Sequence, residues 1–444
     1  MKDDANKRAE KSHSGATKQA AGRIFRNSRK LIGGKAVGGL LSLAYLGIAA
    51  RSLGPEQMGY LVLAHAYVLL IARVARFQSW QAVIRFGTPL IANGDETTFR
   101  TLIRFTVKLD LLSAVGSVFI AVGFLGIVAN LMGWPAEARS HILAYCLATP
   151  FLIAATPTGV LQLFNRFTIL SWQLTLTPIV RLVGALILWR IGGGLTEFLI
   201  VWIASIVLDG AVLWALGWRE LTKRRLMPGR RGDAKASREW LPFMIKTNLS
   251  STVDQVQAQL PLLIVGAVLG SAASGFLKLA VNMSNLIAQP ANMLNQATYP
   301  ELSKIYAERG LRPMRAVAVR SAAFAMLVAT PFTVLYFLFG NQLATIVGGS
   351  AFAPAGVLIG LMAFSQLWRI ASVILESAVL AIGRAGYVLV AQCASAVTNI
   401  AILAAALAPS GVIAAPIAII AGWAALIVFY IFRLNRLPPK KNLS

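Results

Sequence analysis

"LGPEQMGYLVLA" (residues 53–64) and "LGSAASGFLKLA" (residues 269–280) are two versions of one pattern, 216 residues apart. Both contain L-G-x4-G-aromatic-L-x-L-A, with six identical residues at fixed spacing. Coincidence among Leu, Gly and Ala is the alternative explanation, but both stretches occupy the same place, where a predicted first turn enters a predicted second helix. The pattern therefore predicts an internal duplication, with two halves of similar fold.

The composition is that of a chain embedded in lipid. Of the 444 residues, 57% are hydrophobic and 13% are charged, about half of the roughly 25% usual in soluble proteins. Apolar runs of about 20 residues, the length that spans a bilayer, recur along the chain. A transmembrane barrel would instead show alternating segments of about ten residues. We predict an all-α polytopic membrane protein of about twelve helices in two six-helix bundles around a central cavity.

The predicted spans are residues 31–51, 58–77, 103–131, 141–165, 168–190, 196–218, 241–269, 272–298, 316–339, 352–381, 385–408 and 412–433. Residues 78–100 are predicted to add a short, half-buried segment. Six helices per half restore the same orientation, so the halves would be parallel and related by an axis along the membrane normal.

The basic residues predict the orientation of the chain. Nine Lys and Arg lie in residues 1–30 and eight in the connection 219–240, whereas the opposite connections carry few. The positive-inside rule places both termini in the cytoplasm, for a multi-pass protein of the cell inner membrane. The predicted parts are a basic cytoplasmic tail (1–30), an N-terminal bundle (31–218), a cytoplasmic linker (219–240), a C-terminal bundle (241–433) and a second cytoplasmic tail (434–444).

Several stretches resemble a known family. "RSLGPEQMGYLVLAHAY" with the following "VIRFG", "TPTGVLQLFNRFTILSWQLTLTPIVRLVG" (156–184) and "QATYPELSKIYA" (296–307) are similar to bacterial polysaccharide and O-antigen lipid flippases. These form the polysaccharide transporter branch of the multidrug/oligosaccharidyl-lipid/polysaccharide exporter (MOP) superfamily. The resemblance covers most of residues 31–433. One departure is Pro261, where relatives often carry an acidic residue, so an ion-coupling role at that place is in doubt.

The resemblance implies two bundles arranged as a V whose cavity opens alternately to the two sides. The implied cargo is an undecaprenyl-pyrophosphate-linked oligosaccharide, a repeat unit of O-antigen, capsule or exopolysaccharide, moved from the cytoplasmic to the periplasmic leaflet. The implied partners are that glycan, membrane lipids, a polysaccharide polymerase and glycosyltransferases, with no nucleic acid.

Charges inside a bilayer cost about 2.5–3.5 kcal/mol or more each, so they mark a cavity or a partner. Arg369 is the clearest case because polar side chains within roughly 60° of it form a stripe on an apolar helix: Ser365, Gln366, Ser372 and Glu376. Arg181, beyond Pro178, lies about 20 Å into its helix. Both are predicted to line a cavity and bind substrate; a buried ion pair is the alternative for each.

Arg73 and Arg76 share a helix face, and Lys35 is predicted at a similar depth on the adjacent helix. Cations around one mouth would collect a pyrophosphate, and the planar fork of arginine suits phosphate oxygens. Simple snorkelling of both arginines to the cytoplasmic surface explains them equally well.

The seventh and eighth spans carry the remaining candidates. Lys246 and Lys278 are predicted to bind substrate, and the amides of Asn285 and Gln289 to bind sugars, although helix–helix hydrogen bonds would use the same amides. Asp254 and Glu376 are candidates for coupling to a proton or sodium ion. The alternative for Asp254 is a pair with Lys246 or Lys278.

Other classes of function fit the sequence less well. No P-loop pattern points to ATP, and His13, His65 and His141 show no metal-ligand spacing, so neither metal nor cofactor is expected. Cys146 and Cys393 lie in apolar runs and are predicted to be small buried hydrophobes. An exporter of drugs or small cations would favour an acidic cavity. A glycan polymerase or ligase would need a large external loop, and no catalytic residues stand out, so no enzyme is predicted.

Overall fold

The computed structural model describes residues 2–228 and 237–436, with side chains from residue 33 onward apart from short gaps. Every regular element in these ranges is a helix. The first half contains α1 (Lys2–Ala75), α2 (Ser79–Ala92), α3 (Glu96–Leu131), α4 (Ala136–Leu147), α5 (Ala155–Leu163), α6 (Phe167–Ile191) and α7 (Leu195–Lys223). The second half contains α8 (Ser237–Leu269), α9 (Ser271–Arg309), α10 (Leu311–Gly348), α11 (Ala355–Ala381), α12 (Ala385–Ser410) and α13 (Ala414–Arg436).

Long apolar helices account for most of the described chain. Seven helical stretches of the described residues are long and apolar enough to cross a membrane, or eight if the bent pair Arg139–Leu147 and Thr149–Leu163 is one span. The stretches Ala36–Ala92 and Gly386–Arg436 have 57 and 51 residues, over twice the roughly 20 that a bilayer requires, so each holds more than one crossing. With α8 and α9, which are richer in polar residues, the arms number six in each half. The predicted all-α polytopic fold is confirmed.

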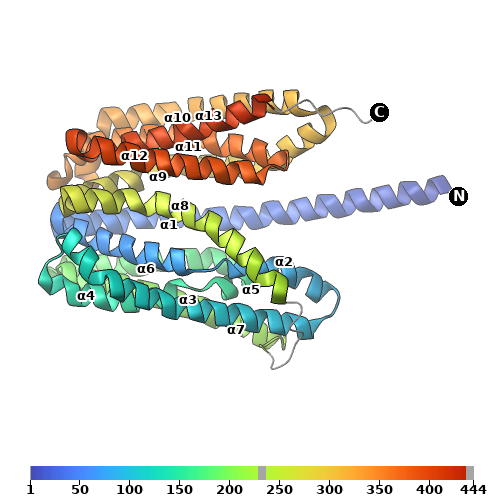
Figure 1. The fold of residues 1–444 in the computed structure, drawn as a ribbon, viewed down its shortest axis with the longest axis horizontal. Helices are drawn as coiled ribbons and strands as arrows, with labels where there is room; N and C mark the ends of the chain where they lie inside the picture. The colour runs from blue at the N-terminus through green and yellow to red at the C-terminus, as the bar shows by residue number, and fades with distance from the viewer. Residues whose placement is uncertain (1, 229–236, 437–444) are drawn as a thin grey trace.

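The internal duplication is also visible in the backbone conformation. Glycines with a positive φ, which other residues adopt at a cost, recur 216 residues apart in three pairs: Gly54 (71°) and Gly270 (86°), Gly94 (73°) and Gly310 (80°), and Gly133 (60°) and Gly349 (88°). Each pair marks the same turn in the two halves. Gly54 divides α1 into two arms, and the chain returns toward α2, at the opposite end of the molecule (Figure 1).

The halves touch through the two copies of the repeated pattern. A Cβ added at Gly59 would overlap the carbonyl oxygen of Ser271, and one added at Gly275 would lie 2.6 Å from the carbonyl oxygen of Pro55. Position 271 is 216 residues after 55, as 275 is after 59, so the two contacts are equivalents related by the repeat. The second glycine of the pattern is therefore required for this close approach of the backbones.

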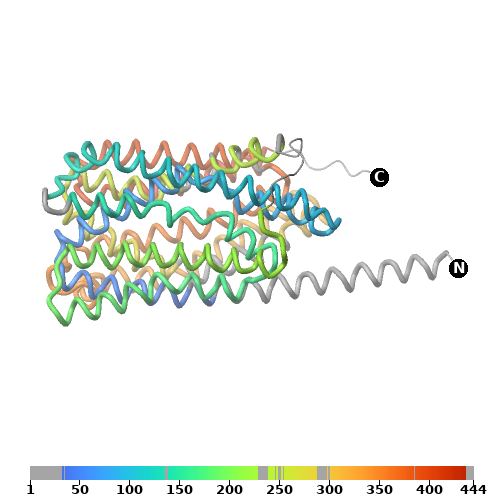
Figure 2. Tube along the Cα trace, turned by 90° about the horizontal axis from the view of Figure 1, so that it is seen from below, coloured from blue at the N-terminus to red at the C-terminus, as the bar shows by residue number. Residues whose placement is uncertain are grey.

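A further contact fastens the same end of the molecule. The Arg51 guanidinium, on the first arm of α1, donates from Nε to the carbonyl oxygen of Val347 at 3.2 Å and from Nη2 to that of Ile346. These carbonyls end α10, where a cation is favoured by the helix dipole. Figure 1 shows the two bundles as layers that meet at this end, hereafter the Gly54 end, and separate toward the end where α2 lies. The helices of both bundles run along one long axis (Figure 2).

The structure differs from the sequence predictions in three places. Residues 141–165 are not one helix: α4 meets the short 3-10 helix η1 (Thr149–Leu152) and α5 at a 46° bend, where Pro150 and Pro157 each lack a backbone donor. The connection 299–315 is helical apart from the turn at Gly310. Cys146 is buried as predicted, but Cys393 is exposed on α12. The prediction of a short additional segment within 78–100 is confirmed by the separate helix α2.

The start of α8 crosses from the second half to the first bundle. Trp240 and Met244 are buried against Ala82 of α2 and Leu102 of α3. The Trp240 ring also lies 5.7 Å from that of Phe105, between centroids. At the end opposite Gly54, the two bundles are therefore held together by this packing of α8 as well as by the covalent connection between the halves.

Replacing Gly59 by Ala tests the contact between the halves. The added methyl group would force apart backbones of both bundles, so we expect a loss of about 2–3 kcal/mol or more in folding free energy. Thermal unfolding of the detergent-purified protein measures it. The matched control is Gly123→Ala on α3, where an added Cβ meets nothing within 4 Å. Equal midpoints for the two variants would contradict the proposed close packing.

Candidate functional site

Arg181 lies near the middle of α6, one turn beyond Pro178, and only 4% of it is exposed. Its Nε donates to the Ser205 hydroxyl of α7 at 2.9 Å. Its Nη1 donates to the Tyr45 hydroxyl of α1 at 3.3 Å. Three helices of the first bundle therefore hold this guanidinium near mid-depth.

Aromatic rings complete the surroundings of Arg181. Its guanidinium carbon lies 4.3 Å from the ring centroid of Trp202, a cation–π distance. Trp202 also meets His65 at 5.0 Å between centroids, and the His65 Nδ1 is hydrogen-bonded to the Tyr145 hydroxyl. None of the ion pairs among the described residues involves Arg181, so hydroxyl groups and ring faces hold the charge where the alternative prediction expected a carboxylate.

A second cation reaches this place from the other bundle. Lys278, in the second turn of α9, is partly buried and lies close enough to Arg181 and His65 for their charges to interact. Asp209 of α7 is also within electrostatic range of Arg181, but both of its oxygens accept from Gln173 Nε2, at 2.8 and 2.9 Å. The structure thus brings together two of the predicted substrate-binding residues at the interface between the bundles.

Arg369 is the centre of a separate polar cluster in the second bundle. It lies midway along α11, partly buried, and its Nη1 donates to the amide oxygens of Asn285 (3.5 Å) and Gln366 (3.4 Å). Gln366 Nε2 donates in turn to the Ser284 hydroxyl at 3.3 Å. The predicted polar stripe of α11 therefore faces α9, and the predicted residues Arg369 and Asn285 meet.

The two arginines near the end of the second arm of α1 have different environments. Arg73 is exposed, whereas Arg76 is partly buried, and its Nε is buried without a hydrogen-bond partner. The charge of Arg76 interacts with that of Asp110. The exposure of Arg73 fits both the snorkelling and the substrate-binding prediction, whereas Arg76 lies within electrostatic range of an interior carboxylate.

Asp110 is a residue whose importance sequence reasoning missed. It is 1% exposed on α3; its carboxylate accepts from the Ser79 hydroxyl at 2.6 Å and from the Thr156 backbone N–H at 2.7 Å. Ser79 begins α2 and Thr156 is the second residue of α5, so the carboxylate faces the positive ends of two helices. The available signal was an acidic residue fourteen positions inside an apolar helix.

Four predicted site residues lie outside the described side chains: Lys35, Lys246, Asp254 and Gln289. Their roles stay predictions, as does ion coupling by Glu376, which is partly buried two turns beyond Arg369 on α11. Within the part of the chain that the structure describes, no group of three or more His, Cys, Asp or Glu side chains could hold a metal ion.

These observations define a class of protein: a polytopic, internally duplicated, two-bundle membrane protein with cations gathered near mid-depth. Solved structures share the fold. A multidrug resistance MATE family transporter of the MOP superfamily, in an inward-facing conformation, matches with a TM-score of 0.72 at 15% identity, over 93% of this chain and 96% of that one. The lipid II flippase MurJ, in an inward closed conformation, matches with a TM-score of 0.69 at 14% identity, over 91% of this chain and 87% of that one.

Sequence comparisons identify the family within this class of membrane proteins. Residues 24–306 match the family model of the polysaccharide biosynthesis proteins, and the chain belongs to this family. The inner membrane protein YghQ of Escherichia coli (strain K12) is 27% identical over 340 residues, which are 76% of this chain and 95% of that protein. The family predicted from the sequence is confirmed.

Asp110→Asn tests whether the buried carboxylate fastens α3 to α2 and α5. The Asn amide can still accept from the Thr156 N–H and donate to the Ser79 hydroxyl, but both bonds lose the carboxylate charge that faces two helix N-termini, so we expect a loss of about 1–2 kcal/mol in unfolding free energy. Denaturant unfolding in detergent measures this loss. The control is Asp95→Asn at the exposed start of α3, where Asn caps equally well. Equal stability of the two variants would show that Asp110 does not fasten these helices.

Proposed function

We propose that this protein is a flippase that moves an undecaprenyl-pyrophosphate-linked oligosaccharide from the cytoplasmic to the periplasmic leaflet by alternating access. Membership of the polysaccharide biosynthesis family supports this cargo, and the fold shared with a lipid II flippase supports its movement between leaflets. The name of the relative YghQ and the excess of basic residues in alternate connections support an inner membrane location with both termini in the cytoplasm.

The observation that carries the proposal is that Arg181 and Lys278, which belong to different bundles, lie within electrostatic range of each other. Two cations placed near each other inside a bilayer repel, and each loses hydration, so the arrangement is costly in isolation. An anionic group between them would relieve both costs. A pyrophosphate carries about two or more negative charges, and it suits the fork of arginine and the point charge of lysine.

Because the two cations belong to different bundles, binding of a ligand to both would be coupled to the relative motion of the bundles. Arg181 belongs to α6 of the first bundle and Lys278 to α9 of the second, so relative rotation of the bundles changes their separation. A pyrophosphate that binds both residues favours the arrangement in which they are close and is released when they part. Differential affinity for two arrangements is what allows a ligand to shift a conformational equilibrium.

The Arg369 cluster would contact the glycan. Asn285 and Gln366 supply amide donors and acceptors, Arg369 supplies further N–H donors, and all three lie together between α9 and α11. Sugars present many hydroxyl groups, which pair with such side chains. A hydrated, amide-lined surface lowers the cost of moving a polar head group through hydrocarbon.

Opening toward the periplasm would break the contacts at the Gly54 end, where Gly59 meets Ser271 and Arg51 meets Val347. We infer that an ion gradient or the membrane potential drives the cycle, with Asp254 and Glu376 as candidate coupling residues. A multidrug or small-cation exporter is the rival within the superfamily. The basic character of the Arg181–Lys278 pair opposes it, because like charges repel a cationic cargo.

Leaflet sidedness in proteoliposomes tests the proposal. We would follow the exposure of a labelled undecaprenyl-pyrophosphate oligosaccharide to an impermeant sugar-cleaving enzyme. Arg181→Gln and Lys278→Gln remove charge-assisted bonds worth about 1.5–3 kcal/mol each, so each should slow flipping about 10- to 100-fold. The matched control, Arg100→Gln, changes a half-exposed arginine that is paired with Glu96 in the first turns of α3, and it should flip at the wild-type rate.

Three outcomes would contradict parts of this account. Wild-type flipping rates in both charge variants would make Arg181 and Lys278 structural residues. Absence of flipping by folded wild-type protein, with proton and sodium gradients supplied, would contradict the function. Transport of cationic drugs by the same protein would favour the exporter.

A further inference from the structure

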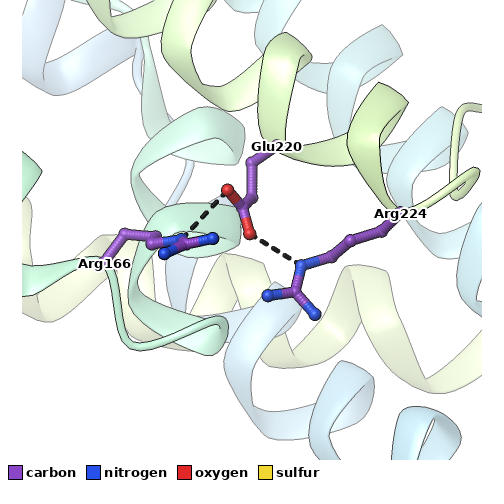
Figure 3. Close-up of polar contacts among 3 residues, drawn as sticks. All are labelled: Arg166, Glu220 and Arg224. Carbon is purple, nitrogen blue, oxygen red and sulfur yellow. Dashed lines mark hydrogen bonds and ion pairs between the residues drawn. The ribbon is translucent and has the colours of Figure 1, made fainter.

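Two arginines and one glutamate form a compact group at the end of the first bundle opposite Gly54 (Figure 3). Arg166 immediately precedes α6, and Glu220 and Arg224 lie at the end of α7. The Glu220 Oε2 accepts from Arg166 Nε at 3.0 Å and its Oε1 from Arg224 Nε at 2.7 Å. The glutamate side chain is 7% exposed, whereas those of the arginines are 36% and 38% exposed.

Glu220 uses little of the donor capacity of the arginines. A guanidinium has five N–H donors, and each arginine gives one of them, from Nε, to the carboxylate. The terminal Nη groups of both side chains lie on the same side of Glu220 in Figure 3. One carboxylate between two guanidinium groups leaves a net positive charge and two forks for another acceptor.

The forks are held in place before any ligand binds. The Arg224 guanidinium carbon lies 3.9 Å from the ring centroid of Phe164, which fixes its plane. Asn165 takes a left-handed turn with φ of 56°, and Arg166 N–H donates to the Leu161 carbonyl at 2.7 Å, which fixes the backbone that carries the second guanidinium. Both arginines would therefore lose little conformational freedom on binding an anion.

Exposed tryptophans indicate the depth of this group in the membrane. Trp172 lies in the second turn of α6 and is 73% exposed, and Trp218 lies just before Glu220 on α7 and is 37% exposed. Tryptophans gather at the boundary between hydrocarbon and head groups. Each arginine lies six residues beyond one of these tryptophans, toward the helix end: Arg166 beyond Trp172 and Arg224 beyond Trp218. Both arginines therefore fall at the level of the lipid head groups.

We propose that Arg166 and Arg224, positioned by Glu220, bind the phosphate of an anionic phospholipid at this surface of the membrane. Phosphate oxygens accept the paired N–H groups of an arginine fork, and two forks at one place distinguish a bound head group from general attraction to a basic surface. The site is separate from the Arg181–Lys278 pair and does not depend on the cargo.

The test measures lipid binding by the full-length protein, purified in detergent and delipidated. Native mass spectrometry would titrate three probes: a short-chain phosphatidylglycerol, the matching phosphatidylcholine and inorganic phosphate. The main variant is the double Arg166→Lys, Arg224→Lys, which keeps the charge and removes the forks. The matched control is Arg312→Lys, Arg320→Lys, which changes two exposed arginines of α10. A third variant, Glu220→Gln, makes the surface more positive but releases the forks.

We expect phosphatidylglycerol to bind the wild-type protein and the control equally, and the main variant about tenfold more weakly. Glu220→Gln should also weaken binding, despite its added positive charge. The proposal is overturned if the main variant binds phosphatidylglycerol as the wild type does, or if phosphatidylcholine binds equally well. Displacement of the lipid by equimolar inorganic phosphate would show a free-anion site instead. A lower unfolding temperature of the main variant with unchanged lipid binding would identify the group as a structural clamp.

Discussion

The reciprocal contact between the two copies of the repeated pattern organises this molecule. Gly59 lies against the Ser271 carbonyl and Gly275 against the Pro55 carbonyl, so the backbones of the two halves touch at the Gly54 end. Side chains at these positions would separate the bundles, displacing both α9 and the second arm of α1. The depth and facing of Lys278 and His65, which follow on these same arms, depend on that approach.

The halves differ where prolines interrupt the first one. Pro150 and Pro157 bend the fourth crossing, whereas the residues 216 positions later are Gln366 and Val373, within the unbroken helix α11. The bend gives α5 its own N-terminus, whose N–H groups need an acceptor, and Asp110 supplies it. The straight helix instead carries Gln366 into the Arg369 cluster. Divergence of a duplicated pair thus produced two different polar sites.

The buried cation of the first bundle is stabilised without a paired carboxylate among the described residues. Ser205 and Tyr45 accept its N–H groups, and the face of Trp202 offers negative quadrupole charge. None of these neutral groups cancels the charge, and Lys278 adds to it from the other bundle. Positive charge from both bundles therefore collects near their interface, and the proposed binding of a pyrophosphate rests on this feature.

The sequence by itself determined the number of helical arms, the duplication and the excess of basic residues in alternate connections, because each follows from local composition or fixed spacing. Its motifs also resemble those of a known family, and the match to the family model confirmed that resemblance. It also identified Arg181, Lys278 and Arg369, since any charge within an apolar run is informative. Only the tertiary structure decided their partners. Arg181 bonds Ser205, 24 positions away, and Tyr45, 136 positions away, each on another helix. Asp110 meets the starts of α2 and α5, and the sequence pattern did not separate α5 from α4. Helical periodicity gives the face of a residue on its own helix, but which neighbouring helix that face meets depends on how the arms pack.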